Sequence, residues 1–308
     1  MSKVKKNALL FFIVVMSLLL LFIAGCGPQE TAQPAATTTN EPPQELTQQE
    51  LEQIVAESVK ATMNANTYKV DMSMSGKFTA DSTQSGDMSM TAKATFDVLQ
   101  KKMLMSMEMS IDSGTSGGKQ EVNGDIYLFT DYMYIKANMP DSGEQWIKVP
   151  VTDEILETFS ANIMQEELKA LELPDKLKFL RYEDFDGSEC YVIGFTPNKD
   201  YLREYASRQQ ASDVEIDWDK LAEISDIYKE LEYTAWIARD TKFVKKIAFN
   251  AVLELSSDFA RSSNVDFETF TMDAAGNLEL FEYNMPVSIV LPEEAAGAME
   301  LSPDAFTQ

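Results

Sequence analysis

The chain has 308 residues, of which 44% are hydrophobic and 25% are charged, and its formal net charge is −24. This composition is typical of a globular protein and excludes the collagen-like and wholly disordered classes. The chain has no histidine, which excludes Ser-His-Asp and Cys-His catalytic sites and the usual imidazole zinc sites. The negative charge argues against nucleic-acid partners, whose phosphates need Lys and Arg. We therefore expect no nucleic acid, metal or cofactor.

The N-terminus predicts a secreted, lipid-anchored protein. Lys3, Lys5 and Lys6 are followed by the uncharged apolar stretch 8–23 and then by Ala24, Gly25 and Cys26, which is typical of a secretory signal. Small residues before a cysteine resemble the lipobox of bacterial lipoproteins, in which that cysteine carries diacylglycerol and becomes the first mature residue. The alternative is an uncleaved membrane helix, but this stretch is short for a bilayer core, which needs about 20 residues. We predict a signal peptide over 1–25 and lipidation, including palmitate, at Cys26.

Cleavage before Cys26 changes the charge and leaves a proline-rich segment at the new N-terminus. It removes three lysines and no acid, so the formal net charge falls from −24 to −27. Residues 26–45 hold four prolines among Gln, Thr and Ala, and predict a disordered tether. We expect the protein on the extracytoplasmic face of the cell membrane, attached by acyl chains and not by charge.

A helix is predicted directly after the tether. Thr47 and Glu50 have the spacing of a capping box, with Leu46 and Leu51 as its hydrophobic staple. An apolar stripe at helical spacing follows, made by Leu51, Ile54, Val55, Val59 and Met63. The helix is expected to end near Asn64 and to lie on an apolar surface.

The remaining patterns predict mainly strands. Period-two alternation or β-rich composition marks strands over 68–75, 88–98, 103–111, 126–130, 132–137, 145–149, 177–182, 189–196, 233–238, 243–255, 265–272 and 278–291. Turn signals lie at 113–118, Asn123-Gly124, Asp186-Gly187 and Gly276-Asn277. Helical spacing marks 152–173, 200–210 and 218–231.

These patterns predict one domain over 46–295, followed by a C-terminal tail over 296–308. Its class is α+β, with a single antiparallel sheet and helices packed on the concave face. About ten or eleven strands approach the limit for an open sheet, which must then curve strongly. We therefore expect a half-barrel with an interior cavity.

The order of these features resembles the LolA-like lipoprotein superfamily, including the LppX and LprG lipoproteins, and most of all its Gram-positive lipoproteins. The resemblance spans roughly 48–292. It implies a half-barrel that holds an acyl chain or another apolar ligand, and it carries no catalytic residues. The matching segments are the lipobox at Cys26, the first helix leading into 68–70, and 132–136, 146–148, 233–238 and 283–289.

Eight of the 17 methionines alternate in three successive predicted strands. They are Met72, Met74, Met88, Met90, Met103, Met105, Met107 and Met109. If these strands pair, the side chains share one face. Three interpretations are open: plain core packing beneath the helix, an adaptable wall of a lipid cavity, or a Cu(I) site made of thioethers.

Two other groups of residues are candidate sites. Cys190 lies in a predicted strand and is either a small buried hydrophobe or a reactive thiol, although no basic activator is near it in sequence. The acidic stretches 184–186 and 213–219 are either a solvated surface or a Ca²⁺ site. The calcium-loop pattern with its central Gly and closing Glu is absent from both stretches, and nothing marks a pair of carboxylates for glycoside hydrolysis.

The leading hypothesis is a non-enzymatic envelope lipoprotein that binds or carries a lipid or other hydrophobic ligand in the half-barrel. The eight methionines are then the expected cavity lining. The alternative is a sensory or protein-interaction lipoprotein without a cavity, which presents aromatic residues to another envelope protein. Its candidate contacts are Tyr127, Tyr132, Tyr134 and Trp146.

Overall fold

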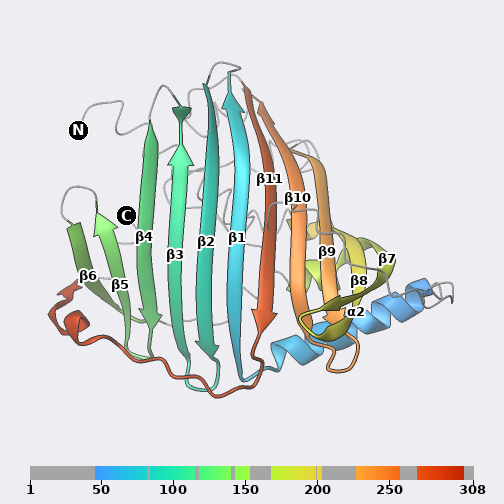
Figure 1. Cartoon of the computed structure of the whole chain (residues 1–308), viewed down its shortest axis with the longest axis horizontal. Helices are drawn as coiled ribbons and strands as arrows, with labels where there is room; N and C mark the ends of the chain where they lie inside the picture. Colours follow the sequence, from blue (N-terminus) through green and yellow to red (C-terminus); the bar gives the residue numbers. More distant parts are fainter. Residues whose placement is uncertain are drawn as a thin grey trace.

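One twelve-stranded sheet dominates the described part of the chain (Figure 1). The computed structural model describes residues 46–81, 84–114, 118–139, 143–152, 168–198, 200–202, 227–256 and 269–301. The strands are β1 (Thr67–Ala80), β2 (Gln84–Asp97), β3 (Lys102–Asp112), β4 (Lys119–Leu128), β5 (Tyr132–Met139), β6 (Gly143–Pro150), β7 (Pro174–Phe185), β8 (Ser188–Pro197), β9 (Tyr228–Ala238), β10 (Val244–Ser256), β11 (Thr269–Phe281) and β12 (Met299–Glu300).

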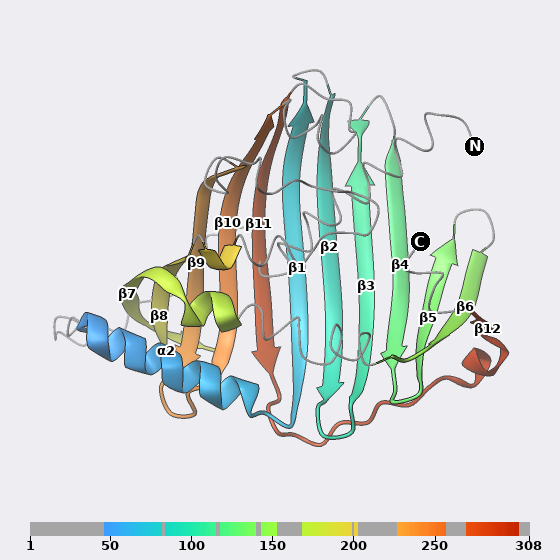
Figure 2. The ribbon, with the colours of Figure 1, turned by 180° about the vertical axis from the view of Figure 1, so that it is seen from behind.

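The sheet is open, with the order β12-β6-β5-β4-β3-β2-β1-β11-β10-β9-β8-β7. Neighbouring strands are antiparallel except for β12, which pairs in parallel with β6. Both views show the sheet curling at its β9–β7 end, where helix α2 (Gln48–Met63) crosses its lower part (Figures 1 and 2). This confirms the predicted α+β class with a curved antiparallel sheet, and gives twelve strands instead of ten or eleven.

The predicted capping box of α2 is present. The backbone N–H of Glu50 donates to Thr47 Oγ1 at 3.3 Å, and the Thr47 N–H donates to Glu50 Oε2 at 2.8 Å. Four of the five stripe residues are buried, but Met63 is 44% exposed. The residues buried beside the stripe include Ser58 and Thr62, which lie on the same face of the helix and have partners for their hydroxyls.

Those hydroxyls fix the helix locally. Ser58 Oγ donates to the Val55 carbonyl at 2.9 Å, and Thr62 Oγ1 accepts from the backbone N–H of Val244 at 3.0 Å. Buried hydroxyls with partners avoid the desolvation penalty of unsatisfied polar groups. The contact from Thr62 attaches the end of α2 to the start of β10.

Two predicted turns are wrong, because both dipeptides lie inside strands. Asn123-Gly124 lies within β4, where Gly124 pairs with Met107 on one side and Ala137 on the other. Gly276-Asn277 lies within β11, where Gly276 pairs with Met74 and Phe249. Pairing on both edges of a long strand overrides a local turn preference in both places.

The turn at Asp186-Gly187 is confirmed. Asp186 has φ 48° and Gly187 has φ 69°, and two positive φ angles are those of the type I′ turn that joins tight hairpins. The predicted loop at 113–118 is also confirmed at its described ends, where the Ser113 N–H donates to the Gly118 carbonyl at 3.2 Å.

The predicted helices are described only in part. Residues 168–172 and 200–202 are helical, whereas 153–167, 203–226 and the predicted segments 1–25 and 26–45 lie outside the described residues. Helix was wrongly expected over 228–231, which begin β9, because Leu231 pairs with Ala251 of β10 in register. No helix within the described ranges is long and apolar enough to cross a bilayer.

Candidate functional site: the methionine face

All eight predicted methionines lie on one face of three adjacent strands. Their positions are related by the register of β1, β2 and β3: Met74 pairs with Met90, which pairs with Met109. Met133 of β5 and Met272 of β11 lie on the same face, because they pair with Leu128 and Phe78 in that register. We call this surface, defined by these ten residues, the methionine face.

Most of these side chains are buried. Met72, Met74, Met88, Met103, Met105 and Met109 are each at most 8% exposed, and Met103 is 1% exposed. Met90 and Met107 are half-buried and pack against the same hydrophobic cluster. A fully buried side chain of this size contributes about 1.5–3 kcal/mol through apolar burial, so the face is a principal part of the core.

Small residues separate the methionines. Ala92 lies between Met72 and Met107 in the register, and Ala94 lies opposite Met105. A methionine has three rotatable bonds beyond its Cα and a polarizable sulfur, so it fits partners of varied shape. Alternation with alanine gives those side chains lateral space along the sheet.

The methionine face belongs to a cluster that extends into both long connections of the fold. Leu168 and Leu171 come from the connection between β6 and β7, and Tyr201 and Ile227 come from the ends of the connection between β8 and β9. All four are buried in the same cluster as the methionines. The buried stripe of α2 joins it from the side of β7 and β10.

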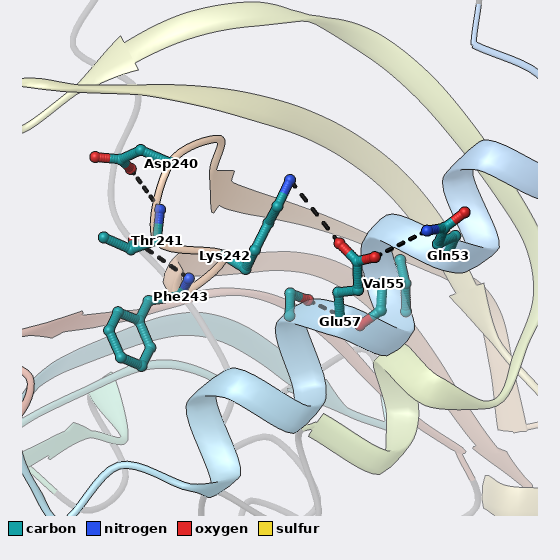
Figure 3. Close-up of polar contacts among 8 residues, drawn as sticks. Gln53, Val55, Glu57, Asp240, Thr241, Lys242 and Phe243 are labelled. Atoms are coloured by element: carbon teal, nitrogen blue, oxygen red, sulfur yellow. Dashed lines mark hydrogen bonds and ion pairs between the residues drawn. The ribbon is translucent and has the colours of Figure 1, made fainter.

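Helix α2 is held to the sheet mainly by apolar contact. Lys242 Nζ, in the turn between β9 and β10, lies 4.0 Å from Glu57 Oε2, and Gln53 Nε2 donates to Glu57 Oε1 at 2.9 Å (Figure 3). Partly exposed ion pairs of this kind contribute about 0–1 kcal/mol. The burial of Leu51, Val55 and Val59 is therefore the larger contribution.

An aromatic cluster bounds the methionine face at the lower end of the sheet. Tyr68 stacks on Phe96 with ring centroids 4.6 Å apart, and Tyr283 stacks on Phe243 at 4.1 Å. Tyr283 donates from its hydroxyl to the Val244 carbonyl at 2.5 Å. Burial raises the pKa of both tyrosine hydroxyls above their ordinary value, so both stay neutral at physiological pH.

The opposite face of the sheet is polar and carries two grooves that the sequence did not indicate. One, of about 380 Å³, crosses β2–β6 and is lined by charged, hydroxyl and amide groups, including Lys93, Asp125 and Lys136. The other, of about 430 Å³, crosses β2, β1 and β11–β9 and includes Lys77, Glu232 and Asp273. Strand alternation places these residues away from the methionines.

The aromatic candidates of the alternative hypothesis also lie on this polar face. Tyr127 is buried, and Tyr132, Tyr134 and Trp146 are half-buried. The Tyr127 and Trp146 rings have centroids 5.8 Å apart, and Lys136 Nζ lies 5.8 Å above the Trp146 ring. Their packing against one another limits the area they present to a partner.

The other candidates from the sequence are Cys190 and the acidic stretches 184–186 and 213–219. Cys190 is fully buried in β8, and burial raises the pKa of its thiol to about 11, as expected for a small buried hydrophobe and not for a reactive thiol. Asp186 lies 3.5 Å from Lys245. Within the described ranges no group of three or more His, Cys, Asp or Glu could hold a metal ion. Residues 213–219 lie outside the described residues.

The model of a family of unknown function, DUF6612, matches residues 50–299. No curated protein matches the chain. Among solved structures, LprF from Mycobacterium bovis is similar at 14% identity, with a TM-score of 0.43 over 79% of this chain and 97% of LprF.

Two further solved structures are similar at comparable identity. The Mycobacterium tuberculosis lipoprotein LppX matches at 14% identity, with a TM-score of 0.39 over 79% of this chain and 100% of LppX. A LolA superfamily protein from Nitrosomonas europaea matches at 13% identity, with a TM-score of 0.21 over 79% of this chain and 96% of that one. No function follows from these matches.

Proposed function

Because the chain belongs to the DUF6612 family, whose function is unknown, we propose a function from its own geometry. The protein is a non-enzymatic envelope lipoprotein that holds a lipid or another hydrophobic molecule against its methionine face. The observation that supports this proposal is the in-register array of methionines on β1, β2 and β3. Plain core packing uses methionine sparingly, because it specifies a unique arrangement poorly.

The array suits an acyl chain in size and chemistry. Each buried CH₂ contributes about 0.8 kcal/mol, so a chain of ordinary length gains enough to bind without any polar contact. Half-buried Met90 and Met107 are diagonal neighbours across β2 and β3, because Met107 pairs with Ala92 and Met90 lies two residues before Ala92. We place the ligand along this line, where methionine side chains can turn aside to accommodate it.

The packing of α2 in the same buried cluster also supports the proposal. Its buried stripe joins that cluster, and its contact between Glu57 and Lys242 is weak. An element held by apolar packing can separate from a Met-rich surface without breaking a buried polar network. We propose that α2 moves to admit the ligand.

Anchoring by acyl chains at Cys26 completes the proposal. Cys26 lies outside the described residues, and the support is the lipobox with its preceding signal. The acidic chain would then be attached at the extracytoplasmic face of the cell membrane by lipid, with the tether over 27–45 joining it to α2.

Native mass spectrometry of the full-length protein, extracted in mild detergent, tests the proposal. We expect a bound hydrophobic molecule that dissociates on unfolding. Ala92→Met adds bulk between Met72 and Met107 and should reduce the bound fraction. The matched control is Thr91→Met, which adds the same side chain to the exposed opposite face and should leave that fraction unchanged.

Two results would contradict the proposal. One is a wild-type protein without any hydrophobic ligand, and the other is equal ligand content in both variants. Crosslinking in intact cells that captured one envelope protein through Tyr132 or Tyr134, with no lipid bound, would favour the interaction hypothesis instead.

A further inference from the structure

Three segments that carry exposed apolar side chains lie at the lower end of the sheet (Figures 1 and 2). The side chains come from the end of α2, from the turn between β2 and β3, and from the segment after β11. We call this set the apolar rim. Its members and exposed fractions are Met63 (44%), Val98 (41%), Leu99 (74%), Met285 (54%) and Val290 (72%).

Hydrogen bonds between the three segments hold most of the rim in place. The Val98 N–H donates to the Asn66 carbonyl at 2.9 Å, which joins the β2–β3 turn to the chain entering β1. The Asn66 N–H donates to Asn284 Oδ1 at 2.8 Å, and Thr67 Oγ1 donates to the Met285 carbonyl at 2.7 Å. Met63, Val98, Leu99 and Met285 therefore belong to one connected structure.

The charge beside the Leu99 part of the rim is opposite in sign to that of the whole chain, whereas exposed Glu293 and Glu294 follow Val290. Lys101 and Lys102 follow Leu99 after one residue, and Lys60 lies in the last turn of α2. Among the nearest acids, Asp97 is 7% exposed and accepts a hydrogen bond from the Gln100 N–H. A second acid, Glu282, lies 2.6 Å from Lys69. An exposed apolar set flanked by lysines, on a chain with net charge −24, fits a surface that is both apolar and anionic.

We propose that the apolar rim docks onto an anionic lipid bilayer, with Leu99 and Val290 entering the interface. This inference deepens the proposed function and uses its anchor at Cys26. Helix α2 begins after Leu46 and runs along the lower end of the sheet in both views (Figures 1 and 2). The 19 residues over 27–45 span about 59 Å at full polyproline extension and about 24 Å as a flexible coil.

That length is sufficient for the rim to reach the membrane that holds the anchor. A helix of 16 residues is about 24 Å long, so the tether matches the distance along α2 from Leu46 to the rim. Docking in this orientation directs the lower ends of β1–β3 at the bilayer. The cluster of Tyr68, Phe96 and Tyr283 then lies between the lipid and the methionine face, on a direct route for a ligand.

Depth-dependent quenching tests the docking. The full mature protein is inserted through its own acyl chains into vesicles of phosphatidylcholine and phosphatidylglycerol, after an environment-sensitive fluorophore is attached at Leu99→Cys. Val122→Cys, at a 38% exposed position of β4, is the matched control, and the fully buried Cys190 should stay unlabelled. Lipids carrying nitroxide on the acyl chain serve as quenchers.

We expect strong quenching and a blue shift at position 99 and neither at position 122. Adding Val290→Gln should weaken the quenching at 99, because loss of one buried aliphatic side chain lowers interfacial partitioning about tenfold. Lys101→Glu, or vesicles without phosphatidylglycerol, should weaken it further. Equal quenching at both positions, or none at 99 in vesicle-bound protein, would overturn the docking.

The same samples separate this inference from the proposed function. If position 99 is quenched but native mass spectrometry finds no hydrophobic ligand, the rim docks and the ligand proposal fails. If a ligand is found without quenching, the ligand proposal stands and the docking fails.

Discussion

Replacing Gly86 with alanine should destabilise the protein, because the methionine face has no space for a Cβ there. Gly86 of β2 pairs with Phe78 of β1. An added Cβ would lie 2.4 Å from Phe78 Cζ and 2.3 Å from the Asp112 carbonyl oxygen. The phenyl ring therefore occupies the place of a side chain at position 86, and the backbone of β3 closes the other side.

The expected magnitude follows from those two contacts. The Phe78 ring can shift only by repacking against Phe270, whose centroid lies 6.2 Å away, and the Asp112 oxygen belongs to a paired strand. Overpacking of this kind costs about 1–3 kcal/mol, and we expect the upper part of that range. Alanine recovers about 0.4–1 kcal/mol by restricting the unfolded chain. The net loss should be about 2 kcal/mol, or a fall in Tm of about 4–8 °C for a domain of this size.

Chemical and thermal unfolding, followed by circular dichroism, measures this loss against two matched variants. Gly194→Ala places its Cβ 3.4 Å from Leu180, an ordinary contact, so its stability should be unchanged or slightly raised. Gly76→Ala meets the Asp273 oxygen at 3.0 Å and the flexible end of Met272 at 3.1 Å and should be intermediate. Equal stability of Gly86→Ala and Gly194→Ala would refute the described packing of Phe78 over β2.

Three further predictions concern the helix cap, the thiols and the aromatic cluster. Thr47→Ala should lower the free energy of unfolding by about 1 kcal/mol, with Thr47→Ser as a near-neutral control. Hydrogen bonds with Thr47 lower the pKa of Glu50 below its ordinary value, so the cap's stabilisation is present above the ordinary pKa of a glutamate and is lost as the pH falls through the lowered value. Glu50→Gln should remove this pH dependence, and a variant with the same pH profile of stability as the wild type would contradict it. A thiol reagent at pH 8 should find no reactive group in the native mature protein and one, Cys190, in urea, whereas two in urea would show that Cys26 carries no lipid. Tyr283→Phe keeps the ring stack but loses a hydrogen bond, so unfolding should require about 1–2 kcal/mol less, and no change would contradict that bond.

Local patterns predicted the fold where side-chain period and long-range pairing agree. The alternation of Met103 to Met109 requires one face of one strand, and its repetition in β1 and β2 placed all eight methionines together. The cap at Thr47 and the type I′ turn at Asp186-Gly187 are also local, because each depends on residues within three positions.

The errors arose where distant residues decide the structure. Gly124 and Gly276 look like turn residues in sequence, but each is paired on both sides by strands that the sequence does not identify as neighbours. The same limit applies to the functional surfaces. The rim unites Met63, Leu99 and Met285 through hydrogen bonds between residues 218 positions apart in the chain, and no local pattern marks that contact.

Photolabelling at single-residue resolution tests the ligand proposal most directly. Full-length protein in its membrane is loaded with a fatty acid that carries a diazirine near its end, with unlabelled fatty acid as competitor. The account predicts competed labelling at Met90, Met107 and neighbouring residues of the methionine face, with Ala92→Met reducing it. Labelling confined to the polar grooves around Lys93 and Glu232, or labelling that the competitor leaves unchanged, would contradict it.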